Sequence, residues 1–160
     1  MTTYAWTIPE YTSQTSTTQS DSTVAAALRK LFGSDIWLDV STGQNADRIP
    51  TAAGDWTLAD GEEAVRQSLL RRIITSPGDW KTKPEYGVGA RRFLKQRATQ
   101  ATADELITLI RGQFGRDKRV EAVLAIEVQW TGALLRLAVA TKLKGRALRD
   151  APLFVSVQVR

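Results

Sequence analysis

The sequence contains no cysteine and no histidine among its 160 residues. Without cysteine the chain can form no disulfide, no thiolate zinc site and no cysteine nucleophile. Without histidine it lacks the usual general base at neutral pH, the Ser-His triad and most transition-metal sites. An enzyme built on this chain would depend on carboxylates, lysine, tyrosine or serine. The sequence therefore predicts no bound cofactor and no metal.

Long apolar runs are also missing. No window approaches the roughly 18 to 20 apolar residues that a transmembrane helix needs. Residues 1–23 have neither the basic nor the apolar region of a secretory signal. We therefore expect a protein made and used in a cytoplasm, unless a larger particle carries it elsewhere.

The overall composition fits one globular domain, with 42% hydrophobic and 24% charged residues. The net charge of +5 arises from 22 basic and 17 acidic residues that are scattered along the chain. Scattered charges indicate a solvated surface more often than a site for an anionic partner.

The N-terminal segment is rich in threonine, serine and glutamine over residues 2–23, which predicts disorder in isolation. Three apolar side chains could instead pin this arm to a partner: Trp6, Ile8 and Tyr11. Both alternatives stay open. Asp21 or Ser22 can cap a short helix that ends at Gly33. We therefore divide the chain into an arm over 1–34 and a single domain over 35–160.

Alternating apolar and polar residues predict β-strands over 35–40, 123–130, 134–143 and 153–160, with a brief strand near Trp56 and Leu58. One face of the 123–130 strand is expected to carry Leu124, Ile126, Val128 and Trp130. The last three strands follow one another along the chain. They predict an antiparallel sheet with one buried face, covered by two or three helices, in an α+β fold.

Helical periodicity is clearest over residues 62–74, where Asp60 is the expected N-cap and Pro77-Gly78 the expected stop. A second, short helix follows near residues 91–94. A third is predicted from Thr102 to Phe114, with Thr102 and Glu105 in a capping-box pattern and Gly115 ending it. The segment between the first two helices is rich in turn residues: Pro77, Gly78, Pro84, Tyr86, Gly87 and Gly89. The Gly87-Val88-Gly89 pattern lacks the context of a phosphate-binding loop.

The segment EAVRQSLLRRIITSPGDWKTKPEYGVG, followed by RRFL, resembles the baseplate-wedge, or sheath-initiator, family of contractile phage tails and related injection systems. The positions that match the family's motif are Val65, Gln67, Leu69, Ile73, Thr75, Pro77, Gly78, Pro84, Tyr86 and Gly87. The resemblance covers about residues 54–160. It departs from the family pattern at Asp79-Trp80, and at Asp117-Lys118-Arg119, where Glu-Pro-Arg is usual.

This resemblance implies a structural protein that joins the baseplate wedge to the sheath. Asp117, Lys118 and Arg119 would dock onto helices of wedge proteins. The last strand would lie at a sheet edge and accept terminal arms of sheath subunits, with docking residues Leu153, Val155, Val157 and Val159. Periodicity alone favours the opposite view, that Arg160 and nearby charges blunt this edge. The resemblance reverses that preference.

The implied partners are the sheath protein and the wedge proteins, with tube or hub proteins as further candidates and no membrane or specific nucleic acid. The implied place is the tail baseplate of a virion assembled in the host cytoplasm. Several copies per particle would let many weak contacts act together.

Two other functions are weighed against this one. The resembled family has carried lysozyme-like labels, and two carboxylates can cleave peptidoglycan without histidine. The candidate carboxylates are Glu62, Glu63, Glu85, Asp104 and Glu105. A basic cluster, consisting of Arg91, Arg92, Lys95 and Arg97, could instead bind nucleic acid. We expect neither, because most of these carboxylates suit helix capping and Phe93 has the spacing of a core residue.

Overall fold

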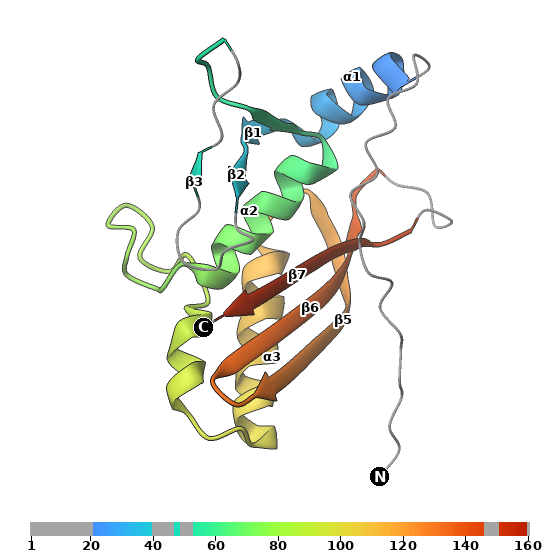
Figure 1. Ribbon diagram of the computed structural model, residues 1–160. Helices are drawn as coiled ribbons and strands as arrows, with labels where there is room; N and C mark the ends of the chain where they lie inside the picture. The colour runs from blue at the N-terminus through green and yellow to red at the C-terminus, as the bar shows by residue number, and fades with distance from the viewer. Residues whose placement is uncertain (1–20, 40–46, 49–52, 146–150, 160) are drawn as a thin grey trace.

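The computed structural model describes residues 21–39, 47–48, 53–145 and 151–159, and it has the predicted α+β architecture (Figure 1). The helices are α1 (Asp21–Phe32), α2 (Glu62–Ile74), the 3₁₀ helix η1 (Ala90–Lys95) and α3 (Gln100–Gly115). The strands are β1 (Ser34–Ile36), β2 (Leu38–Asp39), β3 (Asp47–Arg48), β4 (Leu58–Asp60), β5 (Val120–Thr131), β6 (Leu134–Leu143) and β7 (Leu153–Val159). The apolar side chains predicted to pin the arm lie outside the described residues, and the division at residue 34 stays a prediction.

The main sheet is antiparallel and has the order β5-β6-β7, as the alternation of its three segments predicts. A two-residue turn joins β5 to β6, since Thr131 pairs with Leu134. Gly132 is the first central residue of this turn and has a φ of 60°. A positive φ at that position alone defines a type II′ turn, whose twist matches that of the flanking strands.

A register irregularity in β5 corrects one predicted face. Val123 pairs with Thr141 and Ala125 with Ala140, so the intervening residue, Leu124, has no partner on β6. An extra residue of this kind reverses the alternation of side chains along the strand. Leu124 is consequently 54% exposed, while Val123 packs against the core. The prediction that Leu124 shares the buried face was wrong.

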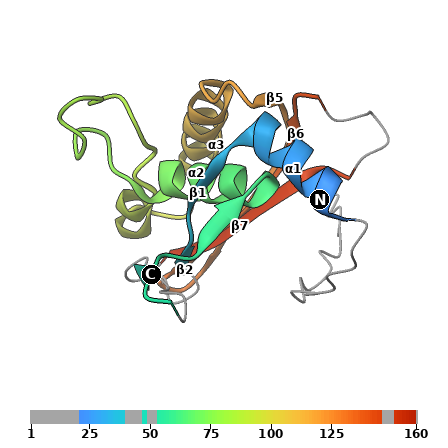
Figure 2. The same ribbon diagram turned by 90° about the horizontal axis from the view of Figure 1, so that it is seen from above.

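Helices cover one face of the sheet, and the hydrophobic core fills the space between the layers. Seen from above, α2 and α3 lie on the same side of β6 and β7 (Figure 2). The core residues are fully buried and come from every layer, including Leu69 of α2, Ile110 of α3, Phe93 of η1 and Leu137 of β6. Phe32 joins them, which seats the end of α1 on the same core.

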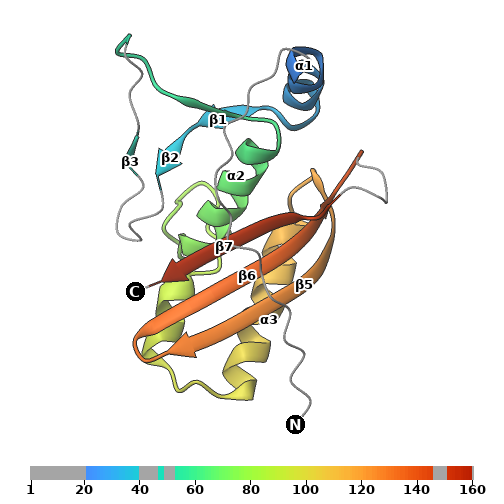
Figure 3. The ribbon, with the colours of Figure 1, turned by 45° about the vertical axis from the view of Figure 1, so that its right-hand side comes forward.

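Two short strand pairs lie on the far side of α2 from the main sheet (Figure 3). Residues 35–40 were predicted as one strand. The described part instead forms two, with β1 pairing with β4 and β2 with β3. Trp37 lies between them, and its backbone N–H donates to Thr57 O at 2.7 Å. The brief strand predicted near Trp56 and Leu58 is β4 and begins at Leu58.

The helix ends differ from the predictions by a few residues. Asp60 belongs to β4 and pairs with Arg29 on α1, so Gly61 occupies the N-cap of α2. Helix α2 ends at Ile74, before Pro77, because Thr75 is already extended. In α3 the capping residue is Thr99, whose hydroxyl accepts the backbone N–H of Thr102 at 3.2 Å.

The capping box predicted at the start of α3 does not form. Glu105 instead lies 3.3 Å from the guanidinium of Arg92. At the other end of α3, Gly115 is the last helical residue and Arg116 follows as the C-cap. No helix among the described residues is long and apolar enough to cross a membrane.

Candidate functional site: the free edge of the main sheet

The strand β7 forms one edge of the main sheet. It pairs with β6 in an unbroken antiparallel register, from Leu135 opposite Val159 to Thr141 opposite Leu153. Within the described part of the chain, no backbone hydrogen bond joins residues 153–159 to any element other than β6. The outer side of β7 therefore presents a row of peptide groups that can pair with another strand.

The hairpin turn shows which residues present those groups. The pair that closes a two-residue turn, here Thr131 and Leu134, is a hydrogen-bonded pair. Beyond this turn, hydrogen-bonded pairs alternate with non-hydrogen-bonded pairs along the two strands. The backbone groups of the even-numbered residues of β6 therefore bond to β5, and those of the odd-numbered residues bond to β7. The odd-numbered residues of β7 accordingly face β6. Phe154, Ser156 and Gln158 direct their N–H and C=O groups toward the free edge.

The side chains at this edge divide in the same way. Leu153, Val155 and Val159 are buried in the core, and Val157 packs against it. These are the side chains that the sequence singled out for docking, and the structure gives them a packing role. Phe154, Ser156 and Gln158 are exposed on the face that the helices leave open, and Phe154 is 53% exposed. A strand added to the edge would lie beside these three residues.

The predicted wedge-docking residues Asp117 and Arg119 meet at the start of β5 in an internal ion pair. Arg119 donates from its Nε and Nη2 atoms to the two carboxylate oxygens of Asp117, at 2.9 and 2.8 Å. Its Nη1 atom donates to the carbonyl of Phe32, at the end of α1, at 3.1 Å. Arg72 on α2 lies 3.5 Å from the same carboxylate. The pair of Asp117 and Arg119 thus joins the end of α1, the helix α2 and the start of β5.

The charges in this cluster stabilise one another. Burial by itself would raise the pKa of Asp117, but the hydrogen bonds from Arg119 and the positive charges of Arg119 and Arg72 outweigh it and hold the pKa below its ordinary value. The hydrogen bond from Arg119 to Asp117 likewise raises the pKa of Arg119. Lys118 is exposed, whereas Asp117 is only 5% exposed. Lys118 is thus the residue of the tripeptide most open to a partner.

The predicted turn residues between α2 and η1 fold back onto the end of α2. The backbone N–H groups of Val88 and Gly89 donate to the carbonyls of Arg72 and Thr75, both at 2.8 Å. They thereby satisfy carbonyls that a helix end leaves unpaired. Gly87 has a φ of 101°, and a Cβ there would lie 2.2 Å from Thr75 O. Only glycine fits this approach.

Side chains from α3 hold the same turn. Gln113 accepts the N–H of Gly87 at 3.2 Å and donates to Glu85 O at 2.7 Å. Gly78 N–H donates to Pro84 O at 2.8 Å, which closes the outer part of the loop. The loop is therefore fixed to two helices at its base.

The carboxylates considered for glycoside hydrolysis have structural partners or lie apart. Glu62 and Glu63 begin α2, whereas Asp104 and Glu105 lie near the start of α3, at the opposite end of the fold (Figure 1). Neighbouring residues on a helix do not face each other across a substrate. A carboxylate oxygen of Glu63 lies 3.2 Å from the guanidinium of Arg66, and burial raises the pKa of Glu63.

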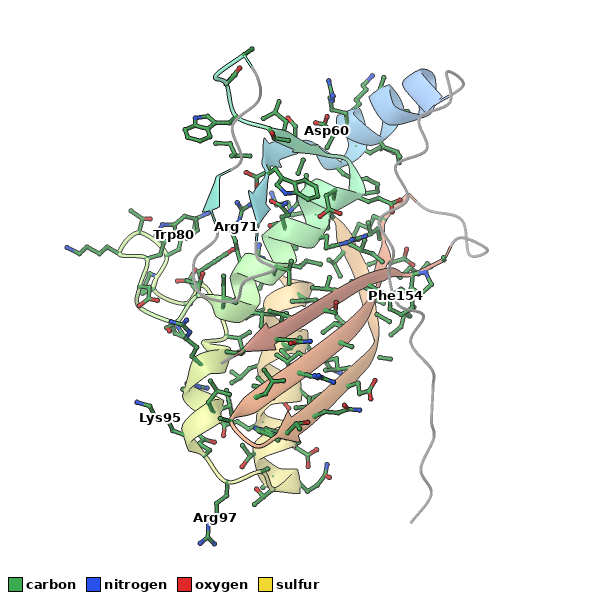
Figure 4. The ribbon with its side chains drawn as sticks, viewed as in Figure 1. Asp60, Arg71, Trp80, Lys95, Arg97 and Phe154 are labelled. Atoms are coloured by element: carbon green, nitrogen blue, oxygen red, sulfur yellow. The ribbon has the colours of Figure 1, made fainter. Side chains whose placement is uncertain are left out.

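The basic cluster considered for nucleic acid is spread over η1 and the loop that follows it. Lys95 and Arg97 point away from the molecule (Figure 4). Arg92 pairs with Glu105 and stacks on Phe93, 4.9 Å from the ring centroid. Phe93 is itself fully buried, so the cluster offers no exposed aromatic ring on which a base could stack. Among the described residues, no group of three or more acidic side chains could hold a metal ion.

The fold defines the protein as an α+β domain whose three-stranded antiparallel sheet has β7 at one edge. The sequence matches no protein-family model and no curated protein. The structure resembles a chain in the cryo-EM structure of the anti-feeding prophage (AFP) baseplate, which was determined with 6-fold symmetrisation. The TM-score is 0.53 at 19% sequence identity, over 83% of this chain and 89% of the other. At this identity the likeness establishes a shared fold.

Proposed function

We propose that this protein is a structural subunit of a contractile injection system, located in the baseplate, where it joins the wedge to the sheath. The free edge of β7 seeds the sheath by accepting a strand from a terminal arm of a sheath subunit. The observation that carries this proposal is the unpaired backbone of Phe154, Ser156 and Gln158. The sequence motif over residues 63–94 and the shared fold with the AFP baseplate chain support it.

The edge suits strand addition for physical reasons. Backbone hydrogen bonds provide attachment that is largely independent of side-chain identity, while side chains at alternate positions determine the register. No proline and no charged side chain interrupts residues 153–159, so the usual protections of an exposed edge are missing there. Several copies arranged in a ring would add many weak contacts, as avidity requires.

The wedge contact is the second part of the proposal. We place it at the start of β5, where Lys118 is exposed beside the ion pair of Asp117 and Arg119. The role of that pair is to hold the turn between α3 and β5 in a fixed shape for the wedge. Arg119 keeps 27% of its side chain exposed, so it is accessible to a partner as well.

A single substitution tests the strand-addition part. Ser156→Pro removes one free-edge N–H, and edge strands tolerate proline where the N–H faces solvent. Ser156→Ala is the matched control because it changes the side chain and keeps the N–H. Deleting residues 155–160 would be a poor test, since Val155 and Val159 are core residues.

The assay is sheath assembly on purified baseplates that carry each variant. We expect Ser156→Pro to remain folded and join baseplates but to seed sheath poorly, whereas Ser156→Ala seeds it normally. Normal sheath assembly on folded Ser156→Pro would contradict strand addition at this edge. Lysis of purified peptidoglycan by the wild-type protein would instead support the enzymatic alternative.

A further inference from the structure

A pocket of about 330 Å³ lies between the C-terminal half of α2 and the loop that follows it. Its walls are formed by Ser68, Arg71, Arg72, Thr75, Asp79, Trp80, Lys83 and Tyr86. The volume lies at the lower end of the range for ligand sites. Two of these side chains come from different elements, Arg71 from the helix and Trp80 from the loop (Figure 4).

Two aromatic rings form the apolar part of this pocket. The rings of Trp80 and Tyr86 are 4.8 Å apart and tilted by 56°. The guanidinium of Arg72 stacks on Tyr86 at 4.9 Å from the ring centroid, which fixes the phenol ring in place. Trp80 remains 51% exposed. An indole held beside a fixed ring and still open to solvent is suited to cover an apolar side chain.

The polar part is cationic on its accessible side. Arg71 and Arg72 each pair with one internal carboxylate, Asp35 and Asp117 respectively. A guanidinium has five N–H donors, and Arg71, whose side chain is 31% exposed, keeps donors that a ligand can reach, whereas the side chain of Arg72 is only 15% exposed. Lys83 has no ion pair among the described residues, and its ammonium lies 5.8 Å from the Trp80 ring centroid.

One acidic residue, Asp79, also lines the pocket. A carboxylate oxygen of Asp79 accepts the backbone N–H of Ser76 at 3.1 Å. That hydrogen bond leaves the negative charge of Asp79 in place, but the wall holds three basic residues, Arg71, Arg72 and Lys83, so its net formal charge is positive.

We infer that this pocket binds a short segment of a partner polypeptide in which an apolar side chain stands next to a carboxylate. The apolar side chain lies against Trp80, and the carboxylate meets Lys83 and the free donors of Arg71. The choice of a polypeptide rests on the proposed function, because a baseplate subunit is surrounded by other proteins. No residue of β7 lines the pocket, so the pocket would provide an attachment in addition to the one proposed for the sheath.

The test is a nuclear magnetic resonance titration of the purified, full-length protein. The probe is a blocked hexapeptide of sequence Gly-Ser-Phe-Asp-Glu-Gly, and its counterpart carries two lysines in place of the two acids. Inorganic phosphate is a third probe, which separates general anion binding from recognition of a peptide. We expect the acidic peptide alone to shift the indole N–H signal of Trp80 and the amide signals of residues 68–86.

Two variants and a matched control define the contacts. Trp80→Ala should weaken peptide binding about ten-fold, as loss of a central aromatic anchor does. Lys83→Glu should weaken it about five-fold, as reversal of an exposed charge pair does. Lys81→Glu makes the same charge change two residues away, at an exposed position outside the pocket, and should leave binding within two-fold.

Three results would each overturn the inference. They are equal binding of the lysine peptide, shifts of the signals of residues 68–86 by phosphate alone, and no shift of the Trp80 signal with the acidic peptide. The titration uses the isolated protein, so it succeeds or fails independently of sheath assembly. Sheath seeding by Ser156→Pro tests the proposed function, whereas the peptide titration tests the pocket alone.

Discussion

Replacing Asp117 with asparagine should reveal how much of the fold depends on one buried carboxylate. Asp117 accepts two side-chain hydrogen bonds and one backbone hydrogen bond from Arg119, and it lies 3.5 Å from Arg72. Asparagine keeps the shape but removes the negative charge and one acceptor. Two arginines would then lie around a neutral amide, with side chains that are 27% and 15% exposed.

The expected loss is large for a conservative change. A hydrogen bond to a charged group contributes about 1.5 to 3 kcal/mol, and removing one partner of a fully buried pair costs about 3 to 5 kcal/mol. Because both arginines retain some contact with solvent, we expect a loss of about 2 to 4 kcal/mol. For a protein of this size, that corresponds to a decrease in Tm of roughly 5 to 15 °C.

Urea denaturation at several pH values is the assay. The pKa of Asp117 is lowered in the folded protein, so its stabilising contribution is present above the ordinary pKa of 3.8 and is lost as the pH falls through the folded pKa. The difference between wild type and Asp117→Asn should therefore be constant from pH 7 to 5 and shrink below about pH 4.

The control for this substitution is Lys118→Gln, which also changes one charge but at an exposed position. It should alter the free energy of unfolding by less than about 0.5 kcal/mol. A loss below about 1 kcal/mol for Asp117→Asn at pH 7, or a difference that persists unchanged at pH 3, would refute the reasoning.

Two further predictions concern stability and use urea denaturation. Gly87→Ala should lower the free energy of unfolding by about 3 kcal/mol or more, because the new Cβ would overlap Thr75 O at a positive φ. Gly112→Ala, inside α3 with open space around it, should raise it by about 0.5 to 1 kcal/mol. An equal effect of the two substitutions would contradict the close approach at Gly87. Thr99→Ala should cost about 1 kcal/mol because it removes the N-cap of α3, and Thr102→Ala should cost less than half of that. A larger loss for Thr102→Ala than for Thr99→Ala would instead support the capping box predicted at Thr102 and Glu105.

Much of the fold could be predicted because its signals are local. Strict alternation identified β5, β6 and β7, and helical spacing from Val65 to Ile73 identified the buried face of α2. The predictions failed where one residue changes the register. Leu124 is exposed because a bulge shifts β5 against β6, and a bulge leaves no mark in the apolar pattern.

Competing partners explain the other failures. Asp60 has the residue type of an N-cap, but it lies in β4 and pairs with Arg29, which is 31 residues earlier in the chain. Thr99 and Thr102 are both acceptable caps, and only the path of the preceding chain selects Thr99. The pairing of β1 with β4 joins segments more than 20 residues apart, a distance over which alternation gives no pairing information.

The candidate site was found in part. The sequence indicated the last strand and the Asp117-Lys118-Arg119 turn, but not which groups are accessible. Counting back from the Thr131-Gly132-Ala133-Leu134 turn identifies Phe154, Ser156 and Gln158, and this count needs the pairing of β6 with β7. The pocket around Trp80 could not be predicted, because its walls come from a helix and a loop whose relative placement depends on tertiary packing.

Amide hydrogen exchange along β7 tests the central claim most directly. In the isolated protein, the N–H groups of Val155 and Val157 should exchange slowly because they bond to β6, whereas those of Phe154, Ser156 and Gln158 should exchange rapidly. In assembled, sheathed particles all five should be protected. Protection of the three edge amides in the isolated protein, or rapid exchange of them in sheathed particles, would contradict strand addition at this edge.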